Sequence, residues 1–424
     1  MPQVRIESLS QGPHAIARVE GKVHLVRGGA PGDLATIEVT EDKGKFSYAR
    51  MATLHEAGPD RREAPCRYLP ECGGCGWQHI DEEAQRSAKQ KSIEETFART
   101  DGLTGVSVDP ILAADHALAY RRRLSLRVEG KRVGFFAGGS HDLIPIENCL
   151  LGIPELEGGI QIAQQWVRRL ETRINRIELA WTGESNRMAV IGQCDGPLAD
   201  GDRGSSEAML REEPRLASIV LHGRGFYHVL GVDRITVALP STEMHVRAGA
   251  FSQVTDTGNH QLIATMLRFA QATPETRIAD LYAGGGNLSI PLALTGASVV
   301  GIERDRRGIE ALRANAERLC LENLEGRVGH VHRTLPKFPV GSFDLVVLDP
   351  PRSGAADAIE ELLRLAPDRI VYVSCNPTTL ARDLGRLVLH YEVENVLPID
   401  LFPQTPHTEA VASLKRRDGK DHPA

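Results

Sequence analysis

The first pattern of hydrophobic and polar residues along the chain is one of short, turn-bounded runs, from Val4 to about His55. Short runs of this kind broken by turn residues are typical of a small β-barrel. We expect its strands at 15–18, 22–26, 35–39 and 46–54. The stretch GPDRREAP at 58–65 has turn residues and charges without periodicity, as an interdomain linker has. The first domain is therefore predicted to span 1–57.

A second pattern, of mixed helical and strand periods, follows the linker and predicts an α+β domain over 58–248. Helical spacing covers 81–100, with Asp81 and Glu82 in its first turn, and returns at 160–173. Strand-like runs lie at 124–128, 133–136, 177–181, 188–194, 218–221 and 226–230. The acidic, glycine-containing segment 195–213 is predicted to be an exposed loop.

The third pattern begins near Gly249 and alternates helix with strand, which indicates a parallel, doubly wound sheet over 249–424. Helices are expected at 256–272, 288–294 and 306–319, and one further helix is expected after each of the strands at 345–348 and 370–373. Strands are expected at 278–282, 298–302, 345–348, 370–373 and 410–414.

Composition narrows the class of protein. The chain has 424 residues, of which 41% are hydrophobic and 25% charged, close to ordinary globular usage. Its start lacks an apolar signal segment and no run of about 18 apolar residues occurs, so we expect a cytoplasmic protein without a membrane partner. A net charge of −6 does not exclude a local basic patch. The basic run from Arg121 to Arg132 is compatible with phosphate contact or with a solvated face.

A candidate cofactor site follows the first strand of the doubly wound sheet. After the strand come Gly284, Gly285, Gly286 and Asn287, and then a helix, so backbone amides can approach a ligand at the carboxyl edge. A dinucleotide fingerprint would need glycine where Ser289 stands, which disfavours a nicotinamide cofactor. Glu303 ends the next strand, where a carboxylate can bind ribose hydroxyls. Asp349 precedes two prolines at another strand end, and together these residues favour an adenosyl cofactor.

Two further residues are candidates for chemistry. Cys375, in Ser-Cys-Asn-Pro, follows the strand at 370–373, so its thiol is expected at the same edge as a nucleophile rather than in the core. Glu409 precedes the last strand after a proline-framed loop, where a carboxylate without a role would be costly to bury. It is the candidate general base.

The cysteines indicate a metal site. Cys66, Cys72 and Cys75 stand in C-x5-C-x2-C order, and three thiols in ten residues of a chain expected in the cytosol favour metal binding over disulfides. A fourth ligand must come from elsewhere, with Cys149, Cys194 and Cys320 as the candidates. A zinc ion and a four-iron cluster both remain compatible with this spacing.

An ordered series of motifs resembles the S-adenosylmethionine-dependent RNA 5-methyluridine methyltransferases, in particular the iron–sulfur members that modify 23S ribosomal RNA. The series comprises the cysteine cluster, Phe251-Ser252-Gln253, DLYAGGGNLSIPL at 280–292, Gly-Ile-Glu at 301–303, Asp-Pro-Pro-Arg at 349–352, Ser-Cys-Asn-Pro at 374–377 and His-Thr-Glu at 407–409. The resemblance covers nearly the whole chain and implies a class I methyltransferase fold, with an OB-type TRAM barrel at the N-terminus and a central domain that carries a cysteine-ligated cluster.

The resemblance also implies a role for each matching residue. S-adenosylmethionine contacts are expected from Gln253, Tyr282, Asn287, Glu303 and Asp349, with Gly284 and Gly286 in the cofactor loop. Cys375 is expected to be the nucleophile and Glu409 the base. Cys66, Cys72, Cys75 and Cys149 are expected to hold a 4Fe-4S cluster. The family usually has asparagine where this chain has Thr255, which can still cap the following helix.

The expected activity is methyl transfer to uracil C5 in 23S ribosomal RNA by a monomer. A transfer RNA uridine is the alternative substrate. Two other classes stay open: an exocyclic-amine methyltransferase, which would need neither Cys375 nor Glu409, and an RNA-binding protein whose methyltransferase domain is not catalytic.

Overall fold

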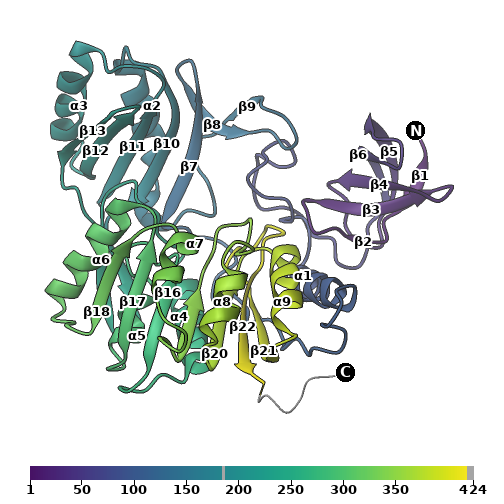
Figure 1. Ribbon diagram of the computed structural model, residues 1–424. Coiled ribbons are helices and arrows are strands. Elements are labelled where there is room, and N and C mark those ends of the chain that lie inside the picture. The colour runs from purple at the N-terminus through teal and green to yellow at the C-terminus, as the bar shows by residue number, and fades with distance from the viewer. Residues whose placement is uncertain (184–186, 418–424) are drawn as a thin grey trace.

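The N-terminal domain is a β-barrel closed by its first few residues. The computed structural model describes residues 1–183 and 187–417, and Figure 1 shows the barrel set apart from the rest of the chain. Its sheet has the order β1-β5-β6-β4-β3-β2, so β1 and β2, two residues apart in the chain, lie on opposite edges. The segment that joins them closes the sheet and leaves neither edge free. The expected strands are confirmed as β3 (His14–Val19), β4 (Lys22–Arg27), β5 (Leu34–Asp42) and β6 (Phe46–Glu56), and β1 (Gln3–Arg5) and β2 (Ser8–Leu9) are added.

The central domain is a mixed sheet with two helices packed against it. The sheet order is β13-β12-β11-β10-β7-β8-β9, and Trp166 of α2 is fully buried in its core. The strands are β7 (Arg123–Glu129), β8 (Arg132–Phe136), β9 (Leu143–Pro145), β10 (Ile174–Trp181), β11 (Met188–Cys194), β12 (Leu216–Gly223) and β13 (Phe226–Gly231). The helices are α2 (Gly159–Arg169), α3 (Asp200–Glu212) and the short 3-10 helix η1 (Pro154–Leu156).

Helix α3 corrects the prediction that 195–213 is an exposed loop. The Asp202 carboxylate accepts hydrogen bonds from the backbone N–H groups of Glu171 and Thr172, both 2.7 Å long. Ser206, one turn later, accepts one from the Trp166 indole at 2.9 Å. Sequence alone missed the helix because these tertiary contacts, rather than an apolar stripe, hold it on the domain.

The C-terminal domain has the doubly wound parallel sheet that the helix–strand alternation predicts. The order is β18-β17-β16-β19-β20-β22-β21. Among the strands described, β22 alone runs in the opposite direction to the rest of the sheet. The strands are β16 (Arg277–Leu281), β17 (Ser298–Glu303), β18 (Leu324–Val328), β19 (Leu345–Leu348), β20 (Arg369–Ser374), β21 (Tyr391–Ile399) and β22 (Glu409–Arg416). The helices are α4 (Asp256–Ala270), α5 (Ser289–Ala293), α6 (Arg306–Arg318), α7 (Val331–Thr334), η2 (Leu335–Lys337), α8 (Ile359–Leu365) and α9 (Pro377–Leu387).

Local chemistry explains where several of these helices begin. Thr255 caps α4 by accepting from the backbone N–H of Gly258, as expected. Asn376 caps α9 by accepting from the N–H of Thr378, and Pro377 occupies the first turn, where no N–H is needed. Because Asn376 directly follows Cys375, this cap fixes the chain direction beside the candidate nucleophile.

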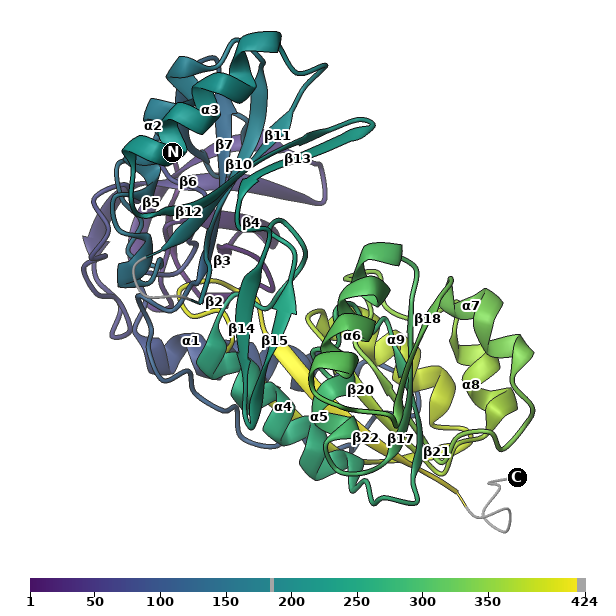
Figure 2. The same ribbon diagram turned by 90° about the vertical axis from the view of Figure 1, so that its left-hand side faces the viewer.

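Two segments within the predicted range 58–248 pack on the C-terminal domain rather than on the central sheet. Helix α1 (Glu82–Ala98), capped by Asp81, places Ile93 and Phe97 in the same hydrophobic cluster as α9, and Figure 1 shows the two helices side by side. The hairpin β14 (Ile235–Leu239) and β15 (Thr242–Val246) packs against α4 and α6, as Figure 2 shows. In the described residues, no helix is both long enough and apolar enough to cross a membrane.

Candidate active site

Neighbouring strand ends bring the predicted site residues to one edge of the C-terminal sheet. In the sheet order, β17, β16, β19, β20 and β22 lie side by side. The residues at this edge of those strands are, in the same order, Glu303, Tyr282, Asp349, Cys375 and Glu409. Since β22 is antiparallel, its first residue lies at the edge where the parallel strands end. Ligands bind at this edge in open α/β sheets.

The glycine loop after β16 is open on the side where a ligand would lie. Gly284 has a φ of +53°, and a Cβ added there would meet no atom within 4 Å. Its backbone N–H donates to the Glu303 carboxylate at 3.3 Å, so the loop and the end of β17 are directly joined. Asn287 exchanges two amide hydrogen bonds, of 2.8 and 2.9 Å, with Asn259 of α4. Gln253, in the segment before α4, is buried.

Buried carboxyl groups concentrate at this edge. Burial raises the pKa of Asp349 to about 7. Burial also raises the pKa of Asp280 to about 7, with smaller contributions from the charges of Asp349 and Glu303. One Asp280 oxygen accepts from the Ser289 hydroxyl, whereas its Oδ1 has no hydrogen-bond partner among the residues described. Such an unpaired buried acceptor suits an edge that receives a polar or cationic ligand.

Cys375 and Glu409 face each other across two antiparallel strands. The β20–β22 register ends with Ser374 opposite Ala410, so the next step along both chains sets Cys375 opposite Glu409. Burial, followed by the charge of Glu409, raises the pKa of the Cys375 thiol to about 11. Burial, followed by the charge of Asp349, raises the pKa of Glu409 well above its ordinary range. The charge of Glu409 therefore acts on the Cys375 thiol, and both groups lie where the sequence predicts chemistry.

Arg352 is the cation of this site. Its charge lowers the pKa of Cys375 and of Glu409, which opposes the effect of burial on both groups. Its guanidinium lies 3.5 Å from Nε2 of His407, and its backbone carbonyl accepts from the side chain of Asn376 at 3.2 Å. Burial, then Arg352, lowers the pKa of His407 to about 4, so His407 is neutral beside this cation at pH 7.

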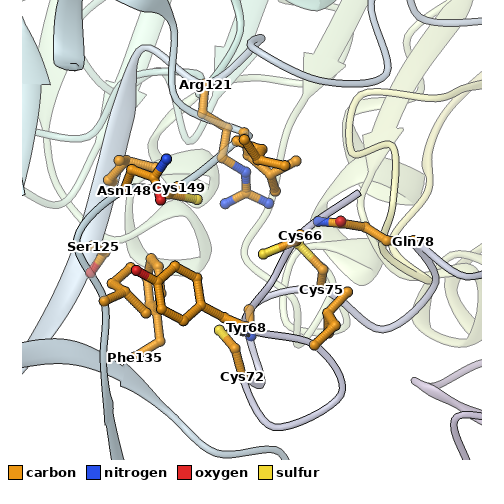
Figure 3. A pocket seen from close by; sticks show the side chains of 16 residues that line it. Cys66, Tyr68, Cys72, Cys75, Gln78, Arg121, Ser125, Phe135, Asn148 and Cys149 are labelled. Atoms are coloured by element: carbon orange, nitrogen blue, oxygen red, sulfur yellow. Dashed lines mark hydrogen bonds between the residues drawn. The ribbon is translucent and has the colours of Figure 1, made fainter. Parts of the chain in front are cut away.

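The four predicted cysteine ligands line one cavity of about 110 Å³. Figure 3 shows Cys66, Cys72, Cys75 and Cys149 around it, with Tyr68, Phe135 and Arg121 in its wall. Burial raises the pKa of the thiols of Cys72 and Cys149, and raises that of Cys75 to about 12. Within the part of the chain that the structure describes, no three His, Cys, Asp or Glu side chains meet in an arrangement that could hold a metal ion. The described residues therefore bring the four cysteines to one cavity without forming a metal site.

The basic run after Tyr120 divides in two: Arg121 to Arg123 make contacts inside the protein, whereas Arg127, Lys131 and Arg132 are exposed. Arg122 is buried and binds Asp256 and the carbonyl of Thr236, both at 2.5 Å. Arg123 pairs with Glu178 at 3.3 Å, and Arg121 lines the cysteine cavity. The expectation of a solvated face holds for the second half of the run, and the internal contacts of the first half were missed because nothing in the sequence shows their partners.

Sequence reasoning missed several residues at the site. Asp280, Arg352 and Asn259 have no distinguishing pattern of their own, although the first two lie inside quoted motifs. Gln404 is buried within the loop that precedes Glu409 and Lys89 is buried beside that loop, and neither has a signal in periodicity or spacing. Their position follows only from the packing of α1 on the C-terminal domain.

Three family descriptions match the chain. Residues 3–52 match the TRAM domain, 241–371 the methyltransferase small domain, and 335–417 the family described as tRNA (Uracil-5-)-methyltransferase. These matches place a TRAM domain at the N-terminus and methyltransferase sequence in the C-terminal half of the chain.

Full-length relatives agree with these matches. The chain is 34% identical, over 96% of its length and 92% of the relative's, to a protein of Pectobacterium atrosepticum named 23S rRNA (uracil(1939)-C(5))-methyltransferase RlmD. It is 33% identical to the protein of that name from Thiobacillus denitrificans, over 98% of this chain and 100% of the relative. The solved Pyrococcus abyssi tRNA (uracil-54, C5)-methyltransferase, in complex with S-adenosyl-L-homocysteine, shares the fold with a TM-score of 0.78 at 23% identity, over 97% of this chain and 100% of that one. The chain belongs to the RNA uracil-5-methyltransferase family.

Proposed function

We propose that this protein methylates C5 of a uridine in 23S ribosomal RNA through a covalent adduct between Cys375 and uracil C6. The observation that carries the proposal is the register of β20 and β22, which sets the Cys375 thiol opposite the Glu409 carboxyl at the ligand-binding edge. The names of the relatives at 33–34% identity favour ribosomal RNA. A transfer RNA uridine is the second candidate, because the Pyrococcus abyssi enzyme of the same fold acts on one.

The residues at the edge fit S-adenosylmethionine. The open space above Gly284, the unpaired Asp280 oxygen and the carboxylate of Glu303 offer room and acceptors for a nucleoside with a positive charge. Asp349 and Gln253 complete the proposed contacts. When bound, S-adenosylmethionine supplies an electrophilic methyl group and leaves as S-adenosylhomocysteine.

Cys375 makes C5 reactive. Uracil C5 is a weak nucleophile, and addition of the deprotonated Sγ to C6 moves the C5–C6 π electrons to form an enolate. C5 of this enolate then forms the bond to the methyl carbon. Arg352 supports the thiolate because its positive charge lowers the pKa of Cys375. Reaching C5 and C6 requires the base to be unstacked from its RNA neighbours.

Glu409 completes the reaction. The adduct now carries both a methyl group and a hydrogen on C5, and the Glu409 carboxylate takes that proton. The C–H electrons restore the C5–C6 double bond as the Sγ–C6 bond breaks and the thiolate leaves. Because its pKa is raised, the Glu409 carboxylate is more basic than an ordinary glutamate.

The test uses two variants with different expected failures. Cys375→Ala should neither methylate RNA nor form a covalent adduct. Glu409→Gln should add to the base and transfer methyl, but it should stall with protein bound to methylated RNA. RNA containing 5-fluorouridine should trap the unchanged enzyme, since fluorine cannot leave as a proton does. Denaturing gels resolve these outcomes.

Two results would redirect the proposal. An adduct formed by Cys375→Ala would mean that the nucleophile is misassigned, and Cys320 would be the next to test. Full methylation by Cys375→Ala would favour exocyclic-amine chemistry, which needs no thiol. Mapping 5-methyluridine in total RNA from a deletion strain separates the ribosomal substrate from the transfer RNA substrate.

We also propose that Cys66, Cys72, Cys75 and Cys149 hold a 4Fe-4S cluster. In support, the four thiols line one cavity whose wall also contains Tyr68 and Phe135, and four cysteine thiolates are the usual ligands of such a cluster. Methyl transfer consumes no electrons, so the cluster would hold the loop in place rather than take part in a step. Protein purified without oxygen should be brown and contain iron. A colourless, folded protein holding one zinc ion would refute this assignment.

A further inference from the structure

Gln404 lies in the loop that leads to the proposed base. Residues 400–408 connect β21 to β22, and Glu409 is the first residue after them. Gln404 is fully buried and has a φ of +67°, which non-glycine residues rarely adopt. Such a conformation persists when the surroundings fix it in several places, and it often marks a functional segment.

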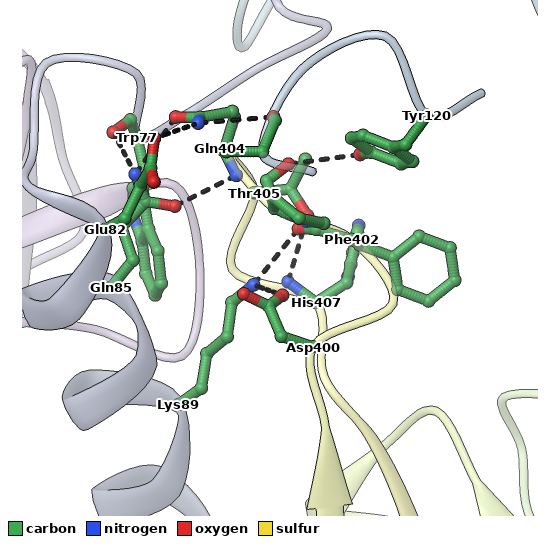
Figure 4. Close-up of polar contacts among 12 residues, drawn as sticks. Trp77, Glu82, Gln85, Lys89, Tyr120, Asp400, Phe402, Gln404, Thr405 and His407 are labelled. Carbon is green, nitrogen blue, oxygen red and sulfur yellow. Dashed lines mark hydrogen bonds and ion pairs between the residues drawn. The ribbon is translucent and has the colours of Figure 1, made fainter. Parts of the chain in front are cut away.

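The side chain of Gln404 makes hydrogen bonds to four residues, of which Figure 4 labels Glu82 and Gln85. Its Oε1 accepts from the guanidinium of Arg62 and from Nε2 of Gln85, both at 3.0 Å. Its Nε2 donates to the carbonyl of Ala117 at 3.3 Å and to the carboxylate of Glu82 at 3.5 Å. Both ends of the amide are therefore satisfied.

The backbone of Gln404 is held from the same side. Its N–H donates to Oε1 of Gln85 at 2.9 Å. Its carbonyl accepts from the N–H of Gly76 at 3.2 Å and of Trp77 at 3.1 Å, the two residues directly after Cys75. Every partner of Gln404 precedes residue 118, so none belongs to the C-terminal sheet that carries Cys375 and Glu409.

Further hydrogen bonds within the loop connect the residues between Gln404 and Glu409. Next to Gln404, the Thr405 hydroxyl donates to the carbonyl of Phe402 at 2.8 Å and accepts from the N–H of His407 at 3.3 Å. Thr408 is buried, and Glu409 then pairs with Ile399 at the start of β22. A substitution at Gln404 is therefore expected to shift Glu409 through residues 405–408, the short segment between them.

We propose that Gln404 is a positioning residue for proton abstraction, which holds the 400–408 loop so that the Glu409 carboxylate faces uracil C5. This proposal rests on the proposed function, because it assumes that Glu409 is the base. Gln404 itself touches neither substrate nor base. Its loss should slow the step in which the C5 proton passes to Glu409 and the Sγ–C6 bond breaks, and it should spare the earlier addition by Cys375.

The experiment measures the two steps separately. Gln404→Ala and Gln404→Gly are each mixed with unmodified 23S ribosomal RNA transcribed in vitro and with radiolabelled S-adenosylmethionine. Denaturing gels then give the rates at which the labelled covalent adduct forms and decays. Glycine accepts the positive φ freely, so the pair separates loss of the side chain from relief of backbone strain. Gln164→Ala is the matched control, since Gln164 bridges Val133 and Lys131 in the central domain.

Both Gln404 variants should release methylated RNA about 10- to 100-fold more slowly, because a displacement of about 1 Å costs a positioned group this much. Adduct formation should change by less than about threefold, and the control should match the unchanged enzyme. If the Gln404 variants do not fold, Arg62→Met takes their place, because it removes one partner of the amide at a partly exposed position. This variant should slow release in the same direction by a smaller factor.

Two outcomes would overturn this role. One is an unchanged release rate in the folded variants. The other is an equal loss in formation and release, which would indicate a general structural role instead. If the unchanged protein forms neither 5-methyluridine nor an adduct, the proposed function itself fails, and this result is distinguishable from both.

Discussion

Replacing Lys89 with methionine should loosen the loop before Glu409. The Lys89 side chain is fully buried on α1, and its Nζ lies 2.5 Å from Oδ1 of Asp400 and 3.0 Å from the carbonyl of Phe402. Figure 4 shows this ammonium group between the two acceptors. Burial lowers the pKa of Lys89, and the charge of Asp400 opposes that effect. The Lys89→Met variant leaves the Asp400 carboxylate buried without its partner.

The magnitude follows from two opposing contributions. At 2.5 Å the attraction is about 7 kcal/mol with an effective dielectric constant of 20. Desolvation of two ions costs several kcal/mol each, so the intact pair contributes little net stability. Removing one partner of a buried pair costs about 3–5 kcal/mol because the other charge stays uncompensated. The double replacement Lys89→Met with Asp400→Leu should restore most of this loss.

Hydrogen exchange of the loop measures the effect locally. The amide of Asp400 donates to the carbonyl of Leu112 at 2.9 Å, and that of Gln404 donates to Gln85. In Lys89→Met both should exchange about 100- to 5,000-fold faster, which corresponds to 3–5 kcal/mol of lost protection. Lys91→Met, on the same helix with an exposed partner 3.9 Å away, should change exchange by less than about threefold.

Two results would contradict this reasoning. If the amides of the folded Lys89→Met protein exchange less than about tenfold faster, the Asp400 carboxylate does not depend on Lys89 for compensation as the distances imply. If the double variant is as loose as the single one, the effect comes from packing rather than from charge. The second result would leave the geometry intact and remove only the electrostatic explanation.

Three further predictions concern ionisation and the barrel. The pKa of Glu409 is raised in the folded state, so the fold loses stability as the pH rises from the ordinary pKa of glutamate to the raised one. Glu409→Gln should therefore melt higher than the unchanged protein at pH 8, with the gap closing as the pH falls toward 5, and an equal gap at both pH values would contradict this. Alkylation of Cys375 followed by mass spectrometry should rise with pH up to about 11, and Arg352→Gln should shift it upward, whereas a midpoint near 9 would show an unperturbed thiol. Deleting 1–57 should leave S-adenosylmethionine binding intact but weaken RNA binding and its salt dependence, and unchanged RNA affinity would argue against a role of the barrel in binding.

The sequence was most informative where a pattern is repeated or where a strand ends. Strand and helix periods located most elements, including β11 at its observed bounds, because alternating or continuous burial leaves a direct trace in residue type. The edge residues Glu303, Asp349 and Cys375 could be brought together because all parallel strands end on the same side, whereas Glu409 joins them because β22 runs antiparallel. That inference needed topology but no distances.

The sequence was least informative where a polar residue is buried by a distant partner. Lys89 and Gln85 look like ordinary helix-surface residues, and α1 has no clear apolar stripe to show which side is covered. Asp202 likewise gave no sign that it would bind Glu171 and Thr172 across the central domain. Such positions are specified by tertiary contacts, so a single sequence carries no periodic trace of them.

The candidate active site depends on both kinds of position, those marked by a sequence pattern and those fixed by tertiary contacts. The C-terminal sheet by itself supplies the thiol, the carboxyl and the proposed cofactor edge. The loop that ends at Glu409, however, keeps its shape through Lys89 and Gln85 of α1 and through the backbone after Cys75. Arg27 of the barrel in turn holds the other side of the cysteine segment, donating to the carbonyl of Pro70 at 2.7 Å. Because the same segment is bonded on one side to the barrel and on the other to the loop before Glu409, one continuous set of hydrogen bonds joins the barrel to the proposed base.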